Sequence, residues 1–127
     1  MKIEDDISYK VIGAAIEVHR VLGGPGLLES VYESSLCHEL RERGLRVQNQ
    51  QLVPVKYKNV EVRDPLCLDI LVEDRVIIEV KATDKLHIVH QSQLLTYLRL
   101  TNLKLGLLIN FGQSCVKDGV RRVVNAL

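Results

Sequence analysis

The chain has 127 residues, of which 46% are hydrophobic and 26% are charged. This composition is typical of a globular protein and excludes an intrinsically disordered chain or a low-complexity fibre. We therefore expect one domain, residues 1–127, with a single core. Seventeen Lys and Arg residues against 16 Asp and Glu give a net charge of +1. This balance argues against a protein that holds a polyanion by bulk charge, so any polyanion needs a local patch.

The cysteines and the apolar runs indicate the compartment. The three cysteines are an odd number and contain no Cys-x-x-Cys pair, which argues against a disulfide framework and against a zinc site. The first six residues lack the apolar stretch of a signal peptide. No apolar run approaches the ~20 residues needed to span a bilayer. We expect a cytoplasmic protein with no membrane partner.

The N-terminal part is predicted to form two helices. Residues 6–22 are predicted to be helical, because apolar residues recur there at spacings of three and four. The sequence Gly-Gly-Pro-Gly at 23–26 then breaks the chain. A second helix is predicted over residues 28–43, closed by Gly44 at the C′ position. Its inward-facing residues are expected to be Val31, Leu36 and Leu40.

From residue 45 the pattern changes to strands. Strands are predicted over 45–47, 52–57, 66–72 and 76–81, with Pro54 marking an edge or a bulge. Residues 85–101 are predicted to be helical, and residues 105–111 to be a strand. A strand, a helix and a strand in that order predict a parallel crossover. Residues 119–124 are expected to form an edge strand. The order indicates an α/β fold with a partly antiparallel sheet.

The hairpin over residues 66–81 carries the most information. Its even positions are all apolar, whereas its odd positions include Asp69, Glu79 and Lys81. A three-residue turn at 73–75 keeps even residues beside even residues and places Asp69 directly opposite Glu79, with Cβ atoms ~5 Å apart. Lys81 then lies one pleat further along the same face. A two-residue turn would put the two carboxylates on opposite faces.

Paired carboxylates beside a lysine suggest a particular chemistry. Two carboxylates at that distance repel each other, and a hard divalent cation such as Mg²⁺ resolves the conflict. The lysine can hold a water or a phosphate beside the metal, which is the layout of metal-assisted phosphodiester hydrolysis. The alternative is a charged, solvated hairpin face.

These residues resemble a known superfamily. Asp69, Glu79 and Lys81 are spaced as in the core of the PD-(D/E)XK nucleases, although Leu68 stands where a proline usually precedes the aspartate. Gln93 and Tyr97 resemble the QxxxY motif of the RecB-like branch. Four residues apart, they share one helix face, which His90 joins. The alternative for this segment is a half-buried helix with a capping tyrosine.

A second resemblance covers residues 6–124. Gly26, Glu29 and Tyr32 are similar to the signature of the small bacterial GxxExxY proteins, which are placed in the same superfamily. The resemblance implies a restriction-endonuclease-like three-layer core, with a mixed sheet of four or five strands flanked by helices. It also implies that Glu29 adds to a metal site and that His19 is a candidate ligand. The alternatives are an acid that stabilises the start of a helix and a structural histidine.

We therefore expect a metal-dependent nuclease that hydrolyses phosphodiester bonds in DNA. The expected cofactor is Mg²⁺ or Mn²⁺, and its expected ligands are Asp69, Glu79, the Val80 carbonyl and Glu29. The catalytic set is expected to be Asp69, Glu79, Lys81, Gln93 and Tyr97, with His19 and His90 as further candidates. A homodimer would double the phosphate contacts. The alternatives are a catalytically silent module that binds nucleic acid or protein, and a structural metal site.

Overall fold

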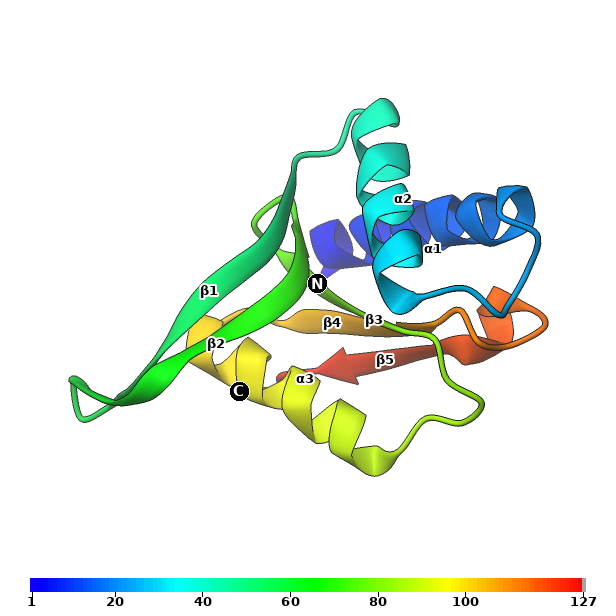
Figure 1. Cartoon of the computed structure of the whole chain (residues 1–127). Helices are drawn as coiled ribbons and strands as arrows, with labels where there is room; N and C mark the ends of the chain where they lie inside the picture. Colours follow the sequence, from blue (N-terminus) through cyan, green and yellow to red (C-terminus); the bar gives the residue numbers. More distant parts are fainter. Residues whose placement is uncertain (127) are drawn as a thin grey trace.

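The computed structural model describes residues 1–126 and shows a three-layer α/β fold. One five-stranded sheet, in the order β1-β2-β3-β4-β5, has α1 and α2 on one face and α3 on the other (Figure 1). The helices are α1 (Lys2–Val21), α2 (Glu29–Glu42), α3 (Ile88–Thr101) and the short 3₁₀ helix η1 (Val116–Gly119). The strands are β1 (Val47–Tyr57), β2 (Val60–Val72), β3 (Val76–Lys81), β4 (Leu105–Asn110) and β5 (Val120–Val124). The expected fold class is confirmed.

The first core cluster lies between the sheet and the helices α1 and α2. The apolar stripe of α1 is buried as predicted, and Gly44 follows α2 with φ +86°. The expectation for Val31 is wrong, because its side chain is 38% exposed while Tyr32 is fully buried. Tyr32 turns inward because its ring stacks on Phe111, with centroids 4.7 Å apart. Within residues 1–126 we find no helix that is both long and apolar enough to cross a bilayer.

The second core cluster lies between the sheet and α3. Leu94 and Leu98 of α3 pack against Ile77 of β3 and Leu108 of β4. Gly106 lies directly under the helix, where a Cβ atom would come within 2.7 Å of the Leu94 side chain. The absence of a side chain at this position therefore sets how closely α3 approaches the sheet.

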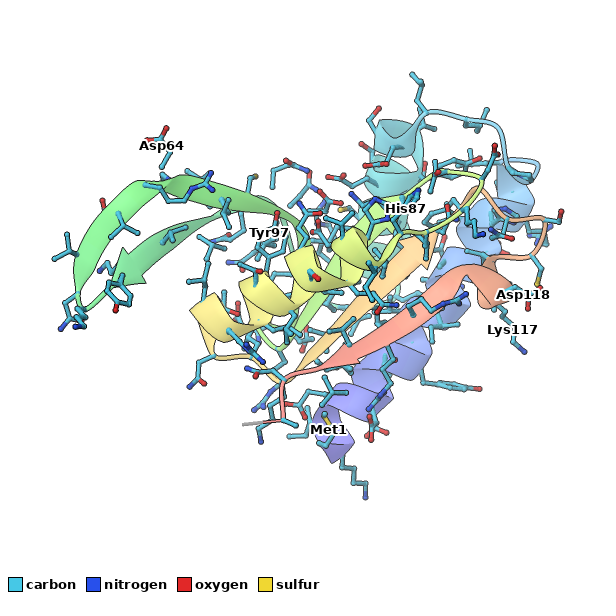
Figure 2. All side chains as sticks on the ribbon, turned by 90° about the horizontal axis from the view of Figure 1, so that it is seen from below. Met1, Asp64, His87, Tyr97, Lys117 and Asp118 are labelled. Atoms are coloured by element: carbon cyan, nitrogen blue, oxygen red, sulfur yellow. The ribbon has the colours of Figure 1, made fainter. Side chains whose placement is uncertain are left out.

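Strands β1 and β2 form a longer hairpin than predicted. Residues 45–47 and 52–57 were expected as separate strands, but β1 is continuous, and β2 begins at Val60 rather than at 66. The turn at Lys58 and Asn59, both with positive φ, closes a two-residue hairpin that extends both strands. The register shifts between Val53 and Val55, so Pro54 lies at both a bulge and the sheet edge. The hairpin projects beyond the helices as an arm, which carries Asp64 (Figures 1 and 2).

The register of the β2–β3 hairpin is as predicted. Ile70 pairs with Ile78 and Val72 pairs with Val76 around a three-residue turn. The apolar even positions of this hairpin do not all pack on one face of the sheet, as their alternation would predict, since Leu68 packs in the α3 cluster whereas Ile70 packs under α1 and α2. The change of face occurs at Asp69, opposite Gln50, whose φ of +56° twists β1 at the same level.

The crossover from β3 to β4 is parallel, and β5 adds an antiparallel edge strand, both as predicted. The connecting helix begins at Ile88 rather than at 85, because residues 82–87 run along the end of β4. There the Asn110 side chain accepts a hydrogen bond from the Thr83 N–H and donates one to the Thr83 carbonyl. This loop leads from Lys81 directly to the start of α3.

The contact between Gly106 and Leu94 can be tested by a double-mutant cycle. We expect Gly106→Ala to lower the free energy of unfolding by about 1–3 kcal/mol through overpacking. In a Leu94→Ala background the new methyl group enters the vacated space, so its cost falls by about 1 kcal/mol or more. Urea unfolding of the four proteins measures this coupling. Additive costs would show that α3 does not rest on Gly106.

Candidate active site

Asp69 and Glu79 lie where β2 separates from β3. The Asp69 N–H donates to Glu79 Oε2 at 2.8 Å, and the Val80 N–H donates to Asp69 Oδ2 at 2.9 Å. The regular pairing of the two strands ends one residue earlier, at Ile70 and Ile78. Each carboxylate thus takes the place of a backbone partner from the other strand. The predicted juxtaposition of the two acids is confirmed.

Burial and mutual repulsion raise the pKa of both carboxyl groups. Burial, opposed in part by the Val80 N–H bond, raises the pKa of Asp69 to about 6. Burial and the Asp69 charge raise the pKa of Glu79, which is 2% exposed, to about 8. The pair therefore favours the binding of a proton or another cation.

The pair fits a hard divalent cation that keeps part of its water shell. Each carboxylate uses one oxygen in the backbone bonds, and residues 1–126 supply no hydrogen-bond donor to the other oxygen of either group. No cluster of three His, Cys, Asp or Glu side chains that could hold a metal occurs within the same residues. Mg²⁺ is commonly bound by one or two carboxylates together with water and substrate phosphate. Two carboxylates are therefore a sufficient protein contribution for this ion.

Lys81 supplies positive charge beside the pair. It is half-buried at the end of β3, and its charge lowers the pKa of both Asp69 and Glu79. Within residues 1–126 its ammonium makes no ion pair shorter than 4 Å. The ammonium is near the carboxylates and remains available to another anion.

Gln93 and Tyr97 connect α3 to β2 by hydrogen bonds. The Tyr97 hydroxyl donates to the Cys67 carbonyl at 3.1 Å and accepts a hydrogen bond from the Gln93 side chain at 3.1 Å. Cys67 precedes Asp69 by two residues, so these bonds fix the strand just before the carboxylate. Burial and the Glu79 charge raise the pKa of Tyr97. Gln93 itself is exposed.

Two glutamates of α2 face the carboxylate pair. Glu29 lies at the start of the helix and is exposed. The charges of both glutamates raise the pKa of Asp69, and the charge of Glu33 has the larger effect. Glu33 also raises the pKa of Glu79. Its Oε2 accepts hydrogen bonds from the side chains of Asn49 at 2.7 Å and Gln50 at 2.5 Å.

The Asn49 side chain links this glutamate to the carboxylate strand. Its Nδ2 also donates to the Asp69 carbonyl at 3.0 Å. Glu33, Asn49 and Gln50 were not among the predicted site residues. The position of Glu33 one turn after Glu29 was a usable signal, since residues four apart share a helix face. The contributions of Asn49 and Gln50 depend on the twist of β1, which no local pattern indicates.

His19 lies in the last turn of α1 and is buried. Its ring is buried against Tyr32 and Phe111, with centroids 6.5 and 6.1 Å away, and its Nε2 has no hydrogen-bond partner within the described part of the chain. Tyr32 donates its hydroxyl to the Gly24 carbonyl at 2.7 Å and accepts the Leu27 N–H at 3.1 Å. These contacts hold the glycine loop in front of α2.

His90 lies at the start of α3, close to Lys81. Its Nδ1 accepts the His87 N–H at 3.2 Å, and the His90 N–H donates to the His87 carbonyl at 3.0 Å. Burial and the Lys81 charge lower the pKa of His90, and the Glu29 charge opposes this shift. The hydrogen bond at Nδ1 leaves Nε2 as the N–H donor of the neutral ring.

The comparisons with known proteins agree with this geometry. A family model described as the PD-(D/E)XK nuclease superfamily matches residues 5–123. Searches of curated proteins and of solved structures give no match.

The carboxylate pair predicts how stability depends on pH. The pKa of Glu79 is about 8 in the folded protein, whereas the ordinary value of 4.5 applies in the unfolded chain. Between these two pH values the folded protein therefore holds a proton that the unfolded chain releases. Without divalent cations, the free energy of unfolding should therefore fall as the pH rises through this window, by up to about 1.4 kcal/mol per unit for each proton. Denaturant unfolding between about pH 5 and pH 8 measures it.

Glu79→Gln removes the ionisation, so it should flatten this dependence and raise stability at the alkaline end. Glu61→Gln, on the exposed arm, is the control and should leave the slope unchanged. A Glu79→Gln slope equal to that of the wild type would contradict the assignment.

Proposed function

Because the chain belongs to the PD-(D/E)XK nuclease superfamily, we propose that it is a metal-dependent nuclease that hydrolyses phosphodiester bonds in DNA. The observation that carries the proposal is the buried Asp69 and Glu79 pair with Lys81 beside it. A buried pair of like charges is unfavourable for folding, so its presence calls for a reason outside stability.

The proposed metal ligands are Asp69, Glu79 and the Val80 carbonyl. The first two each have an oxygen that receives no hydrogen-bond donor from residues 1–126. The Val80 N–H points to Asp69, and the carbonyl of a strand residue points to the same edge as its N–H. Bound Mg²⁺ or Mn²⁺ would lower the pKa of a water and stabilise charge on the phosphate.

Lys81 is the proposed electrostatic group. Its ammonium lies near both carboxylates and has no ion-pair partner within 4 Å among residues 1–126. It can donate to a phosphate oxygen and orient the attacking water. Groups of this kind contribute about 10²–10⁴-fold to a rate.

Gln93 and Tyr97 are proposed as positioning residues. Both polar groups are engaged with each other and with the Cys67 carbonyl, so they act on the reaction through the strand that carries Asp69. His90 is proposed to donate its Nε2–H to substrate, because its other nitrogen is engaged at the start of α3. His19 keeps a structural role in this proposal, packed on Tyr32 and Phe111.

The alternative is a catalytically silent module that binds nucleic acid or protein. It is favoured by the net charge of +1 and by a carboxylate pair without a third ligating side chain in residues 1–126. This alternative predicts no cleavage with any metal. With either function, a homodimer would double the available phosphate contacts. Analytical ultracentrifugation measures whether the protein is a dimer.

The two functions are separated by variants of Asp69 and Lys81. For the nuclease, Asp69→Asn should abolish both the calorimetric binding of Mg²⁺ or Mn²⁺ and the cleavage of labelled DNA. Lys81→Ala should leave metal binding nearly unchanged and reduce cleavage by about 10²–10⁴-fold. Cleavage is measured on a panel of linear, nicked, branched and single-stranded substrates.

Lys117→Ala is the matched control, since this exposed lysine lies in η1 and outside the pair. It should behave as wild type. Metal-dependent cleavage that survives Lys81→Ala would refute the role of Lys81, whereas wild-type protein that cleaves nothing would favour the binding module.

The third acidic position of the site is tested separately. The sequence resemblance favours Glu29, whereas the charge effects on both carboxylates favour Glu33. We expect Glu33→Gln to weaken Mg²⁺ binding by about 10–100-fold, as loss of an outer-shell partner does. Glu29→Gln should have the smaller effect. Calorimetry on the two variants ranks them, and a larger effect of Glu29→Gln would restore Glu29 as the ligand.

A further inference from the structure

A polar cavity lies beside the candidate active site, on the α3 face of the sheet. Its volume is about 250 Å³, and it is enclosed by the loop before α3, the end of β4 and the start of β5. Its lining includes Lys85, His87, Gln91, Asn110, Asp118 and Arg121. Figure 2 shows His87 at the start of α3 and Asp118 in the segment that precedes β5. None of these six residues belongs to the metal site proposed above.

The sheet register places this cavity in line with Lys81. Lys81 pairs with Asn110 on β4, and Arg121 on β5 pairs with Leu108, the neighbour of Glu79. Leu108 packs in the α3 cluster, so Arg121 is on the same face. Adjacent strands are about 4.8 Å apart, so β5 lies roughly 10 Å from β3. At ~3.4 Å of rise per nucleotide, this distance corresponds to about three nucleotide steps along one DNA strand.

The cavity offers cations and neutral donors. Within residues 1–126, Lys85 and Arg121 have no carboxylate partner within 4 Å. The Gln91 amide adds N–H donors. Asp118 is the one acid among the described lining residues, so the cationic side chains outnumber it. Arg121 is anchored through Nη1, which donates to the Asp118 and Val120 carbonyls at 3.0 Å.

The walls of the cavity are closely packed. A Cβ atom on Gly112 would lie 2.2 Å from the Thr83 carbonyl oxygen, and one on Gly119 would lie 2.4 Å from that of Asn110. Both glycines therefore allow backbone segments to meet that no other residue would allow. The Asn110 side chain bonds both backbone groups of Thr83. The donors are thus presented by a preformed frame.

The start of α3 links the cavity to the candidate active site. His87 lines the cavity, whereas His90 lies near Lys81, and the His90 ring accepts the backbone N–H of His87. A strand that follows this path meets Lys81, the two imidazoles, and then Lys85 and Arg121.

We propose that this cavity binds a backbone phosphate of the DNA strand whose scissile phosphate lies at Lys81, with Lys85 and Arg121 as its cationic partners. The inference rests on the proposed nuclease function, because it assigns a nearby phosphate of that same substrate. The cavity sets where the strand lies relative to the carboxylate pair, so Lys85 and Arg121 are binding residues.

The test is the salt dependence of binding to a labelled single-stranded DNA oligonucleotide without divalent cations. For single strands the slope of log K against log salt changes by about 0.7 per phosphate contact. Lys85→Gln with Arg121→Gln should weaken binding and reduce the slope by about that amount. Lys85→Arg with Arg121→Lys keeps the charges and should retain most of the affinity. Asp118→Asn removes the opposing charge and should tighten binding, which a folding defect would not do.

The matched control is Lys2→Gln with Lys10→Gln, which removes two exposed cations of α1 on the other side of the sheet. It should leave the slope close to that of the wild type. A slope unchanged by Lys85→Gln with Arg121→Gln overturns the cavity assignment, even if the protein cleaves DNA. Wild-type protein that binds no DNA overturns the proposed function and this inference with it.

A second probe separates backbone phosphate from free phosphate. Inorganic phosphate is titrated while the amide NMR signals of residues 85–91 and 113–121 are followed. Shifts that saturate in wild type and vanish in Lys85→Gln with Arg121→Gln support a phosphate site. If they occur while the DNA slope is insensitive to the same variant, the cavity takes free phosphate and the assignment to the DNA strand is wrong.

Discussion

Burial of two carboxylates in the gap between β2 and β3 is the constraint on which the rest of the structure depends. Asp69 and Glu79 each accept a backbone N–H from the opposite strand, so their carboxylate oxygens take the place of two backbone carbonyl acceptors of a regular sheet. Burial and repulsion raise the pKa of both groups. A gap of this kind opposes folding at neutral pH unless a proton or a metal occupies it. The surrounding layers hold the gap open.

Each layer contributes one support to that gap. From α3, Tyr97 bonds the Cys67 carbonyl, and from α2, Glu33 reaches Asp69 through the Asn49 amide. The twist at Gln50 turns β2 at this level, so Leu68 packs under α3 whereas the next apolar residue packs under the other two helices. Asp69 lies at the turning point. A strand that serves both layers therefore carries the residue on which the chemistry depends.

Much of the arrangement around the carboxylate pair could be predicted from local patterns in the sequence. The alternation of residues 66–81 predicts the hairpin, its three-residue turn and the juxtaposition of Asp69 with Glu79, because a one-residue slip would bury charge on the apolar face. The strand predicted over 76–81, the helix over 85–101 and the strand over 105–111 likewise predict the parallel crossover. Spacing on a helix places Gln93 beside Tyr97. These features depend on neighbours in sequence and on period, which the chain displays directly.

The sequence by itself thus determined the register of the β2–β3 hairpin and the two opposed carboxylates, because side-chain alternation and turn length favour one pairing, whereas the three layers were implied by the family resemblance. Only the tertiary structure decided which side chains surround the carboxylates. Tyr32 is buried in place of Val31 because Phe111, far along the chain, offers a ring to stack on. Glu33 enters the site because β1 twists at Gln50, and Arg121 comes into line with Lys81 because β5 joins β4. These contacts join distant segments, and local periodicity carries no information about them.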